Sequence, residues 1–305
     1  MIKQIKVLAV LLSACCSVSL ALASDTGGAK KVSDKAQIER VISAGGSISE
    51  WLVAMGGEKS LVGVDTTSLH PSSLQDLPSI GYQRQLAAEG VLTLQPQILF
   101  GSAEMGPPPV LEQLSAAGVR IETLSIDADL AAVSSTVRYM GGVLGLSEQA
   151  EQALAEFNQA MQQHEYTLKT VQTPAPHVLL IFSAGQGNPL SAGSNTVGDW
   201  LIKQAGGNNV AQHQGFKALS SESMLALNPQ VIIVADRHNK GLKTLDTLLT
   251  NAPALRHTEA VLNKRVLAID PTLLVGGLGP RIPEQVEQLI SIFYPQLVTQ
   301  MAAKD

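Results

Sequence analysis

The sequence has 305 residues, of which 45% are hydrophobic and 15% are charged, and its formal net charge is −5. This composition is typical of a globular protein with one large hydrophobic core or two of ordinary size, and it excludes the disordered and fibrous classes. The acidic balance argues against a general nucleic-acid or anionic-membrane binder, because no basic surface is available to such partners.

The first 23 residues have the features of an export signal. Lys3 and Lys6 precede an apolar run that begins at Val7, and Ala21-Leu22-Ala23 fits a signal-peptidase cleavage site. The alternative is a lipoprotein signal, in which Cys15 would be lipidated and would become the first mature residue. Both interpretations predict that the protein is exported.

The only two cysteines, Cys15 and Cys16, lie within this signal segment. Cleavage after Ala23 would therefore leave no disulfide framework, no thiolate metal site and no cysteine nucleophile. The mature protein must then be stabilised by its hydrophobic cores.

Alternating strand and helix signals follow from residue 38 to residue 124. Apolar runs predict strands at 38–42, 61–64, 97–100 and 119–124. A helix is predicted over 48–55, because Ser47 and Glu50 have the spacing of a capping box. Another helix is predicted from Pro107 to Ala117, and a short one must end before Pro96. Such alternation predicts a parallel sheet covered by helices.

One long helix is predicted over 147–171, since its apolar residues recur at a spacing near 3.5 and it holds no Gly or Pro. Strand signals resume at 177–182 and 231–234. We therefore predict an α/β protein of two Rossmann-like lobes with parallel sheets, joined by one long helix, with the ligand cleft between the lobes. The predicted boundaries are 1–23 for the signal peptide, 36–145 for the first lobe, 146–173 for the connecting helix and 174–305 for the second lobe.

An internal repeat supports the two-lobe interpretation. Trp51-Leu52 recurs as Trp200-Leu201, and the pair Gly56-Gly57 recurs as Gly206-Gly207. Segments 89–97 and 222–230 also match, each as Glu followed by an apolar run, Pro and Gln before a strand. The first lobe carries the longer stretch between these landmarks, and such extra loops commonly set specificity.

Tyr82 lies in that longer stretch, on a loop that begins at Gly81, with Arg84 two residues on. A neighbouring guanidinium favours the charged form of a phenol, and phenolate is a ligand for ferric iron, including haem iron. The alternative is an ordinary half-buried loop tyrosine that hydrogen-bonds to the backbone.

The signal segment, the two lobes, the single connecting helix and the L-x-P-Q strand entries resemble the periplasmic substrate-binding proteins of the helical-backbone class, which serve ABC importers for siderophores, cobalamin and haem. Within that class, segments 67–71, 77–86 and 279–284 are similar to the haem-binding subgroup. The resemblance implies that Tyr82 is the axial ligand of the haem iron and that Arg84 hydrogen-bonds to its phenolate. It implies haem b (hemin) as the transported ligand, held in the periplasm.

The resemblance also implies that Glu89 and Glu222, one on each lobe, dock on the inner-membrane ABC permease, which works with its ATPase. An outer-membrane haem receptor is a candidate donor of the ligand. Arg237 and Arg281 are candidates for binding the haem propionates, because guanidinium matches carboxylate geometry. Some members of the subgroup offer a histidine where this chain has Ala184, so a second axial ligand from that loop is not expected.

Other functions fit the sequence less well. A ferric siderophore or cobalamin is the alternative ligand, although siderophore sites tend to use several aromatic residues and only 4% of this chain is aromatic. The scattered histidines do not suggest a zinc or manganese cluster, and His70, His213 and His238 are the ones that could line the cleft. No strand is followed by G-x-G-x-x-G, and no P-loop or G-x-S-x-G motif occurs, which argues against an enzyme.

Overall fold

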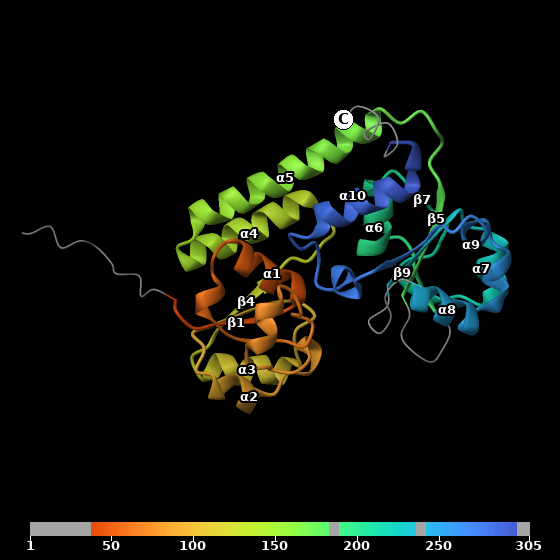
Figure 1. Ribbon diagram of the computed structural model, residues 1–305. Coiled ribbons are helices and arrows are strands. Elements are labelled where there is room, and N and C mark those ends of the chain that lie inside the picture. The colour runs from red at the N-terminus through yellow and green to blue at the C-terminus, as the bar shows by residue number, and fades with distance from the viewer. Residues whose placement is uncertain (1–37, 183–188, 236–241, 298–305) are drawn as a thin grey trace, which may run out of the picture. The chain divides into compact units, whose positions relative to one another are not determined.

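The computed structural model describes residues 38–182, 189–235 and 242–297, which form two lobes, each on its own sheet (Figure 1). The first sheet has the order β2-β1-β3-β4, and all its strand pairs run parallel. Its strands are β1 Val41–Ala44, β2 Leu61–Val64, β3 Ile98–Ser102 and β4 Arg120–Leu124. The four strands predicted for this lobe are present, although the first begins at Val41 and not at Ile38. The central strands β1 and β3 are fully buried, as expected where a parallel sheet is covered on both faces.

The helices of the first lobe include one that was not predicted. They are α1 Gly46–Ala54, α2 Ala88–Thr93, α3 Pro108–Ala116 and α4 Leu130–Leu144. The unpredicted helix is α4, and its ends carry recognisable signals. The Asp129 carboxylate accepts a hydrogen bond from the Ala132 amide at 2.8 Å, and Gly145 ends the helix with φ of 72°.

The capping box predicted at Ser47 and Glu50 is wrong. Helix α1 already begins at Gly46, and the amides of Gly45 and Gly46 donate to the side chains of Asp65 and Thr67 from the next loop. The Ser47 hydroxyl and the Glu50 carboxylate are therefore free for contacts with the second lobe, which are described below. A tertiary contact has replaced the local cap.

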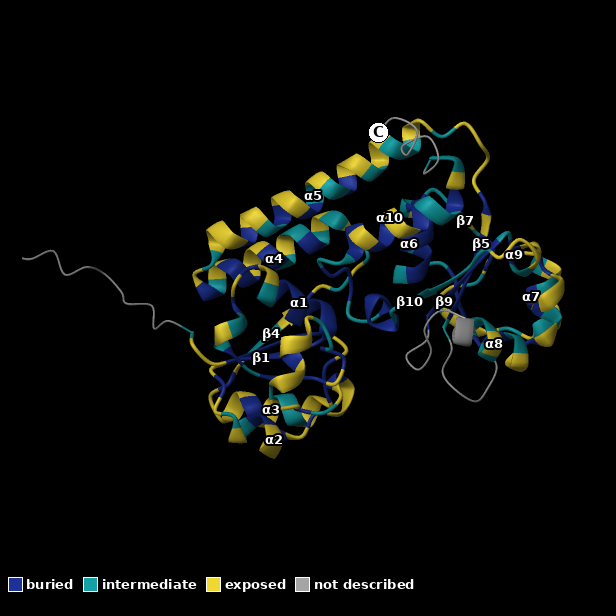
Figure 2. Ribbon diagram, viewed as in Figure 1, coloured by how far each residue is buried: buried dark blue, intermediate teal, exposed yellow. Residues whose placement is uncertain are grey.

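The long helix α5 spans Ser147–Lys169, as predicted, and runs beside α4. Its buried residues, Ala150, Leu154, Phe157 and Met161, follow a spacing of four, three and four, so one stripe faces the core and the rest is partly or fully exposed (Figure 2). The Phe157 ring packs edge-on against Trp51 of α1, with 5.3 Å between ring centroids. At its other end, α5 contacts α10 (Ile282–Phe293), where His164 Nε2 lies 2.9 Å from the Pro283 carbonyl oxygen.

The second sheet is mixed, whereas the sequence predicted a parallel one. Strands β10, β9 and β5 are neighbours and run parallel, β7 pairs with the start of β5, and β6 and β8 add antiparallel strands at the other side. The strands are β5 His177–Phe182, β6 Leu190–Ala192, β7 Asn208–Asn209, β8 Phe216–Ala218, β9 Val231–Ala235 and β10 Val266–Ile269. The short strands β6 and β8 lack the long apolar runs by which β5 and β9 were predicted.

The remaining helices are α6 Val197–Gln204, α7 Ser221–Leu227, α8 Leu242–Asn251 and α9 Glu259–Leu262. The repeat is visible in the structure, since Trp51 lies on α1 and Trp200 on α6. Each of these helices is followed by a glycine in the left-handed region, Gly56 with φ of 78° and Gly206 with φ of 77°.

Among the described residues, no helix is both long and apolar enough to cross a bilayer. The predicted signal peptide lies outside the described residues.

Candidate ligand-binding site

The loop that carries Tyr82 is anchored by a buried residue at every third position. Ile80, Gln83 and Leu86 are at most 5% exposed, whereas Tyr82 and Arg84 between them point outward. Two backbone hydrogen bonds tie the loop to Gly106: the Gly106 amide donates to the Gln83 carbonyl at 3.0 Å, and the Leu86 amide donates to the Gly106 carbonyl at 2.8 Å. The phenol and the guanidinium are thus presented from an anchored loop.

Arg84 is paired with Glu104, a residue that sequence reasoning did not identify. Its Nη2 lies 2.6 Å from Glu104 Oε1 on the loop after β3. The hydrogen bond and charge of Glu104 raise the pKa of Arg84 against an opposing effect of burial, and the nearby Tyr82 adds a smaller contribution. The role of Arg84 in stabilising a Tyr82 phenolate stays a prediction.

Both side chains line a cavity of about 470 Å³ whose walls come from the two lobes. This volume lies in the range of small-molecule sites. The first lobe contributes Tyr82, Arg84, Glu104 and residues 126–128, and the second contributes 195–197, 215–216 and 274–277. Glu104 and residues 126–128 follow the carboxyl ends of β3 and β4, where open α/β sheets place their ligands. The predicted cleft between lobes is present, and it contains Tyr82 and Arg84.

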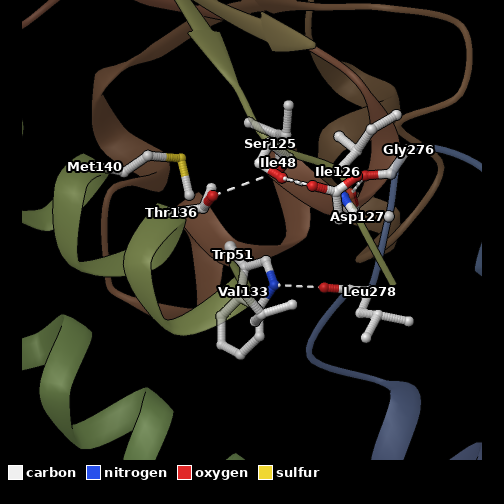
Figure 3. Close-up of a pocket in the computed structure, with 12 residues that line it drawn as sticks. Ile48, Trp51, Ser125, Ile126, Asp127, Val133, Thr136, Met140, Gly276 and Leu278 are labelled. Carbon is white, nitrogen blue, oxygen red and sulfur yellow. Dashed lines mark hydrogen bonds between the residues drawn. The ribbon is translucent and has the colours of Figure 1, made fainter. Parts of the chain in front are cut away.

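Next to this cavity, and sharing residues 126–127 and 276–277 with it, the lobes are joined by a close contact that we call the seam (Figure 3). Trp51 Nε1 donates to the Leu278 carbonyl at 2.8 Å, and the Ser47 hydroxyl donates to the Gly276 carbonyl. Gly277 has φ of 91°, and a Cβ atom on it would lie 3.0 Å from the Ile126 backbone. Any larger residue would be strained there, so the glycine permits this close approach.

A second set of contacts between the lobes consists of Glu50, His70, Asp270 and Arg281, which we call the interlobe network. Two nitrogens of Arg281 bind the two oxygens of Glu50 at 2.6 and 2.9 Å. Asp270 lies 3.2 Å from Arg281 Nη1 and 2.6 Å from His70 Nε2. Glu50 is only 5% exposed, so its charge depends on this bidentate partner.

The interlobe network also shifts the pKa values of Asp270 and Arg281. Burial opposes the charge on Asp270, but hydrogen bonds from Thr272 and the charges of Arg281 and His70 hold the pKa of Asp270 below its usual value. Burial likewise opposes the charge on Arg281, and Glu50 and Asp270 together raise its pKa. Both groups are therefore stabilised in their charged forms.

The structure does not place Arg281 on the cavity of Tyr82. Arg281 lines a separate hollow with Asp270, and two carboxylates of the protein already hold its guanidinium. Its assignment to a haem propionate stays a prediction. Arg237, His238 and Ala184 lie outside the described residues.

None of the histidines in the described part of the chain lines the cavity of Tyr82. His70 belongs to the interlobe network, and His213 Nε2 lies 3.1 Å from the Ser191 carbonyl oxygen. His164 is bound to the Pro283 carbonyl. The cavity instead contains Phe216, which sequence reasoning missed because only the fold brings β8 to the cleft.

Glu89 and Glu222 occupy equivalent places on the two lobes. Each is exposed and lies in the first turn of a short helix, α2 or α7. Backbone and Ser220 hydrogen bonds lower the pKa of Glu222, so its carboxylate is charged at neutral pH. The helix dipole also favours an acidic residue at this place, so position alone does not establish a docking role.

Comparison with known proteins places this geometry in a family. The model of the periplasmic binding protein family matches residues 41–273. The chain belongs to the periplasmic binding protein family. This is a family of substrate-binding proteins and not of enzymes, and its members deliver ligands to transporters.

Individual relatives refine the similarity. A periplasmic haem-binding protein from Pseudomonas aeruginosa is 50% identical, with a TM-score of 0.82 over 85% of this chain and 93% of that one. The periplasmic haem-binding protein HutB of Vibrio cholerae is 34% identical, with a TM-score of 0.76 over 84% and 99% of the two chains. A vitamin B12-binding protein of Yersinia pestis is 26% identical over 65% of this chain and 69% of its own length.

Proposed function

We propose that this protein binds haem in the periplasm and delivers it to an ABC permease. Tyr82 supplies the phenolate ligand to the iron, and Arg84 stabilises the charge of that phenolate. The observation that carries the proposal is that both side chains line one cleft of suitable volume. The 50% identity to a haem-binding protein supports the same ligand.

Haem fits the chemistry of this cleft. A phenolate is a hard anionic ligand for ferric iron. Leu274, Val275 and the Phe216 ring give the cavity the apolar surface that a porphyrin requires. Cobalamin is the second candidate, supported by the similarity to a vitamin B12-binding protein. Its cobalt needs no phenolate, so the cobalamin hypothesis leaves Tyr82 without a role.

The direct test is titration of the purified mature protein with hemin and, separately, with cyanocobalamin. We expect a Soret band characteristic of tyrosinate-bound ferric haem, which Tyr82→Ala and Tyr82→Phe both lose without a change in circular dichroism. Binding of cyanocobalamin with no binding of hemin would refute the proposal. Unaltered hemin affinity and spectrum in both Tyr82 variants would refute the ligand assignment alone.

Docking on the permease is a separate part of the proposal. Glu89 and Glu222 present one carboxylate from each lobe, and arginines on a permease would bind them. Changing both residues to Ala should abolish hemin uptake in cells while hemin binding in solution is unchanged. Glu112→Ala, at an exposed acidic position on α3, serves as the matched control. Normal uptake by the double variant would show that the two glutamates do not dock.

Export and localisation complete the proposal. A periplasmic protein requires the cleavable signal that ends near Ala23, or the lipid anchor at Cys15. The mass of the mature protein from cell fractions distinguishes the two.

A further inference from the structure

Phe216 is an exposed aromatic residue on the wall of the cleft that the second lobe contributes. It is 44% exposed and lies at the start of β8, in the same cavity as Tyr82. Its backbone is fixed, because β8 pairs antiparallel with β6 and places Phe216 opposite Ala192. The ring therefore stands at a defined place in the second lobe.

A second aromatic residue supports this ring. Phe182, at the end of β5, packs edge-to-face against Phe216 with 6.3 Å between ring centroids and 65° between ring planes. In such a pair one ring is held by the other, and the remaining face of Phe216 stays available. A ligand that covers this aromatic surface would gain the free energy of removing it from water.

The remaining described residues of this wall are small or already engaged. Asn195, Val197 and Gly215 offer no ring, and the Thr196 hydroxyl donates to the Gly193 carbonyl and accepts from the Asp199 amide. Among the described residues that line the cavity, Phe216 is thus the side chain suited to contact the face of a flat aromatic ligand.

We propose that Phe216 stacks on the face of the porphyrin opposite to Tyr82, and that this contact selects a flat macrocycle independently of the iron. The inference rests on the proposed function, since it assigns the second wall of the same cleft. Phe216 is a specificity-determining residue, because stacking requires an open, planar π-surface. A corrin ring is puckered, carries saturated substituents and has ligands on both faces of its cobalt, so it cannot make this contact.

The test uses hemin and iron-free protoporphyrin IX, which separate stacking from iron ligation. Phe216→Leu should weaken the binding of both ligands by a similar factor of about ten, as expected for loss of one aromatic contact. Phe216→Trp should restore binding of both. Tyr82→Phe should weaken hemin alone and leave the affinity for protoporphyrin IX unchanged.

Tyr166→Leu is the matched control, since Tyr166 is 66% exposed on α5 and does not line the cavity. Protoporphyrin IX affinity within twofold of the unaltered protein in Phe216→Leu would overturn the inference. So would a loss confined to hemin, which would mean that Phe216 acts through the iron. If the unaltered protein binds protoporphyrin IX but not hemin, the proposed function fails while the protoporphyrin series still decides the role of Phe216. Binding of neither ligand would overturn both.

Discussion

Two arginines of this protein occupy opposite kinds of environment. Arg84 projects into the cleft, its side chain is 53% exposed, and its one carboxylate partner, Glu104, is exposed as well. Arg281 lies at the junction of the lobes, its side chain is 26% exposed, and it binds Glu50 with two hydrogen bonds and Asp270 with a third. An exposed pair can exchange partners at little cost, whereas a buried one cannot. Arg84 is therefore available to a ligand, and Arg281 holds the lobes together.

The largest difference between the two arginines should appear in stability. Arg281→Met leaves the Glu50 carboxylate buried without a partner and should lower the free energy of unfolding by about 3 kcal/mol. Arg84→Met removes an exposed pair and should cost less than about 1 kcal/mol. Urea denaturation of both variants measures these two losses in the free energy of unfolding. The double variant Glu50→Gln, Arg281→Met should recover much of the stability that Arg281→Met loses. Equal losses in Arg281→Met and Arg84→Met would contradict the distinction between a buried and an exposed arginine.

For retention of hemin, we expect a substitution of Arg84 to have a larger effect than a substitution of Arg281. In the proposed site, Arg84→Ala removes the charge that would stabilise the Tyr82 phenolate, so protons would compete more effectively with iron. On acidification, hemin should be released at a higher pH than from the unaltered protein, by on the order of half a pH unit because Arg84 is exposed. The Soret band recorded against pH measures the midpoint. An unchanged midpoint would contradict the role of Arg84.

Acid should weaken the interlobe network through Asp270. The pKa of Asp270 is lowered in the folded protein, so its contribution to stability is present above the unfolded value of about 3.9 and is lost as pH falls below it. Below about pH 4, the unaltered protein should lose stability more steeply than Asp270→Asn as pH falls. Denaturation midpoints across this range test it, and parallel curves would assign the acid sensitivity to other groups.

The spin state of the iron should not respond to the histidines. Among the described residues no histidine lines the cavity, and His70 belongs to the interlobe network. A tyrosinate alone gives a weak field, so the ferric complex should be high-spin by electron paramagnetic resonance. That signal should persist in His70→Ala, His213→Ala and His238→Ala. A low-spin signal that disappears in any one of them would identify a histidine as second ligand.

The smallest expected effect concerns movement of the lobes. The interlobe network, the seam at Trp51 and Leu278, and the α5–α10 contact all join the two lobes. We therefore expect the radius of gyration to change by less than about one ångström when hemin binds. Small-angle scattering of the free and hemin-bound protein measures it. A change of several ångströms would mean that the interlobe network opens.

The sequence by itself determined the local elements. The buried strands and α5 were predicted because their apolar residues recur at the period of the element, and this pattern needs no knowledge of distant residues. Tyr82 and Arg84 also needed no knowledge of distant residues. They are two residues apart on one loop, and this loop resembles that of the haem-binding subgroup. The short strands β6 and β8 were not predicted, because they lack long apolar runs. Helix α4 was missed although its buried residues Val133, Val137, Met140 and Leu144 have helical spacing.

Only the tertiary structure decided which residues meet across the lobes. Ser47 and Glu50 fit a capping box by their spacing, yet Ser47 binds Gly276, and Glu50 binds Arg281, which lies 231 positions along the chain. A local cap contributes about 1 kcal/mol, whereas a buried Glu50 carboxylate without Arg281 would cost about 3 kcal/mol, so the assembled fold favours the ion pair. Phe216 reached the cleft in the same way, because strand pairing placed it there and no local pattern marks it. Spacing predicts contacts within an element, whereas contacts between elements depend on the assembled fold.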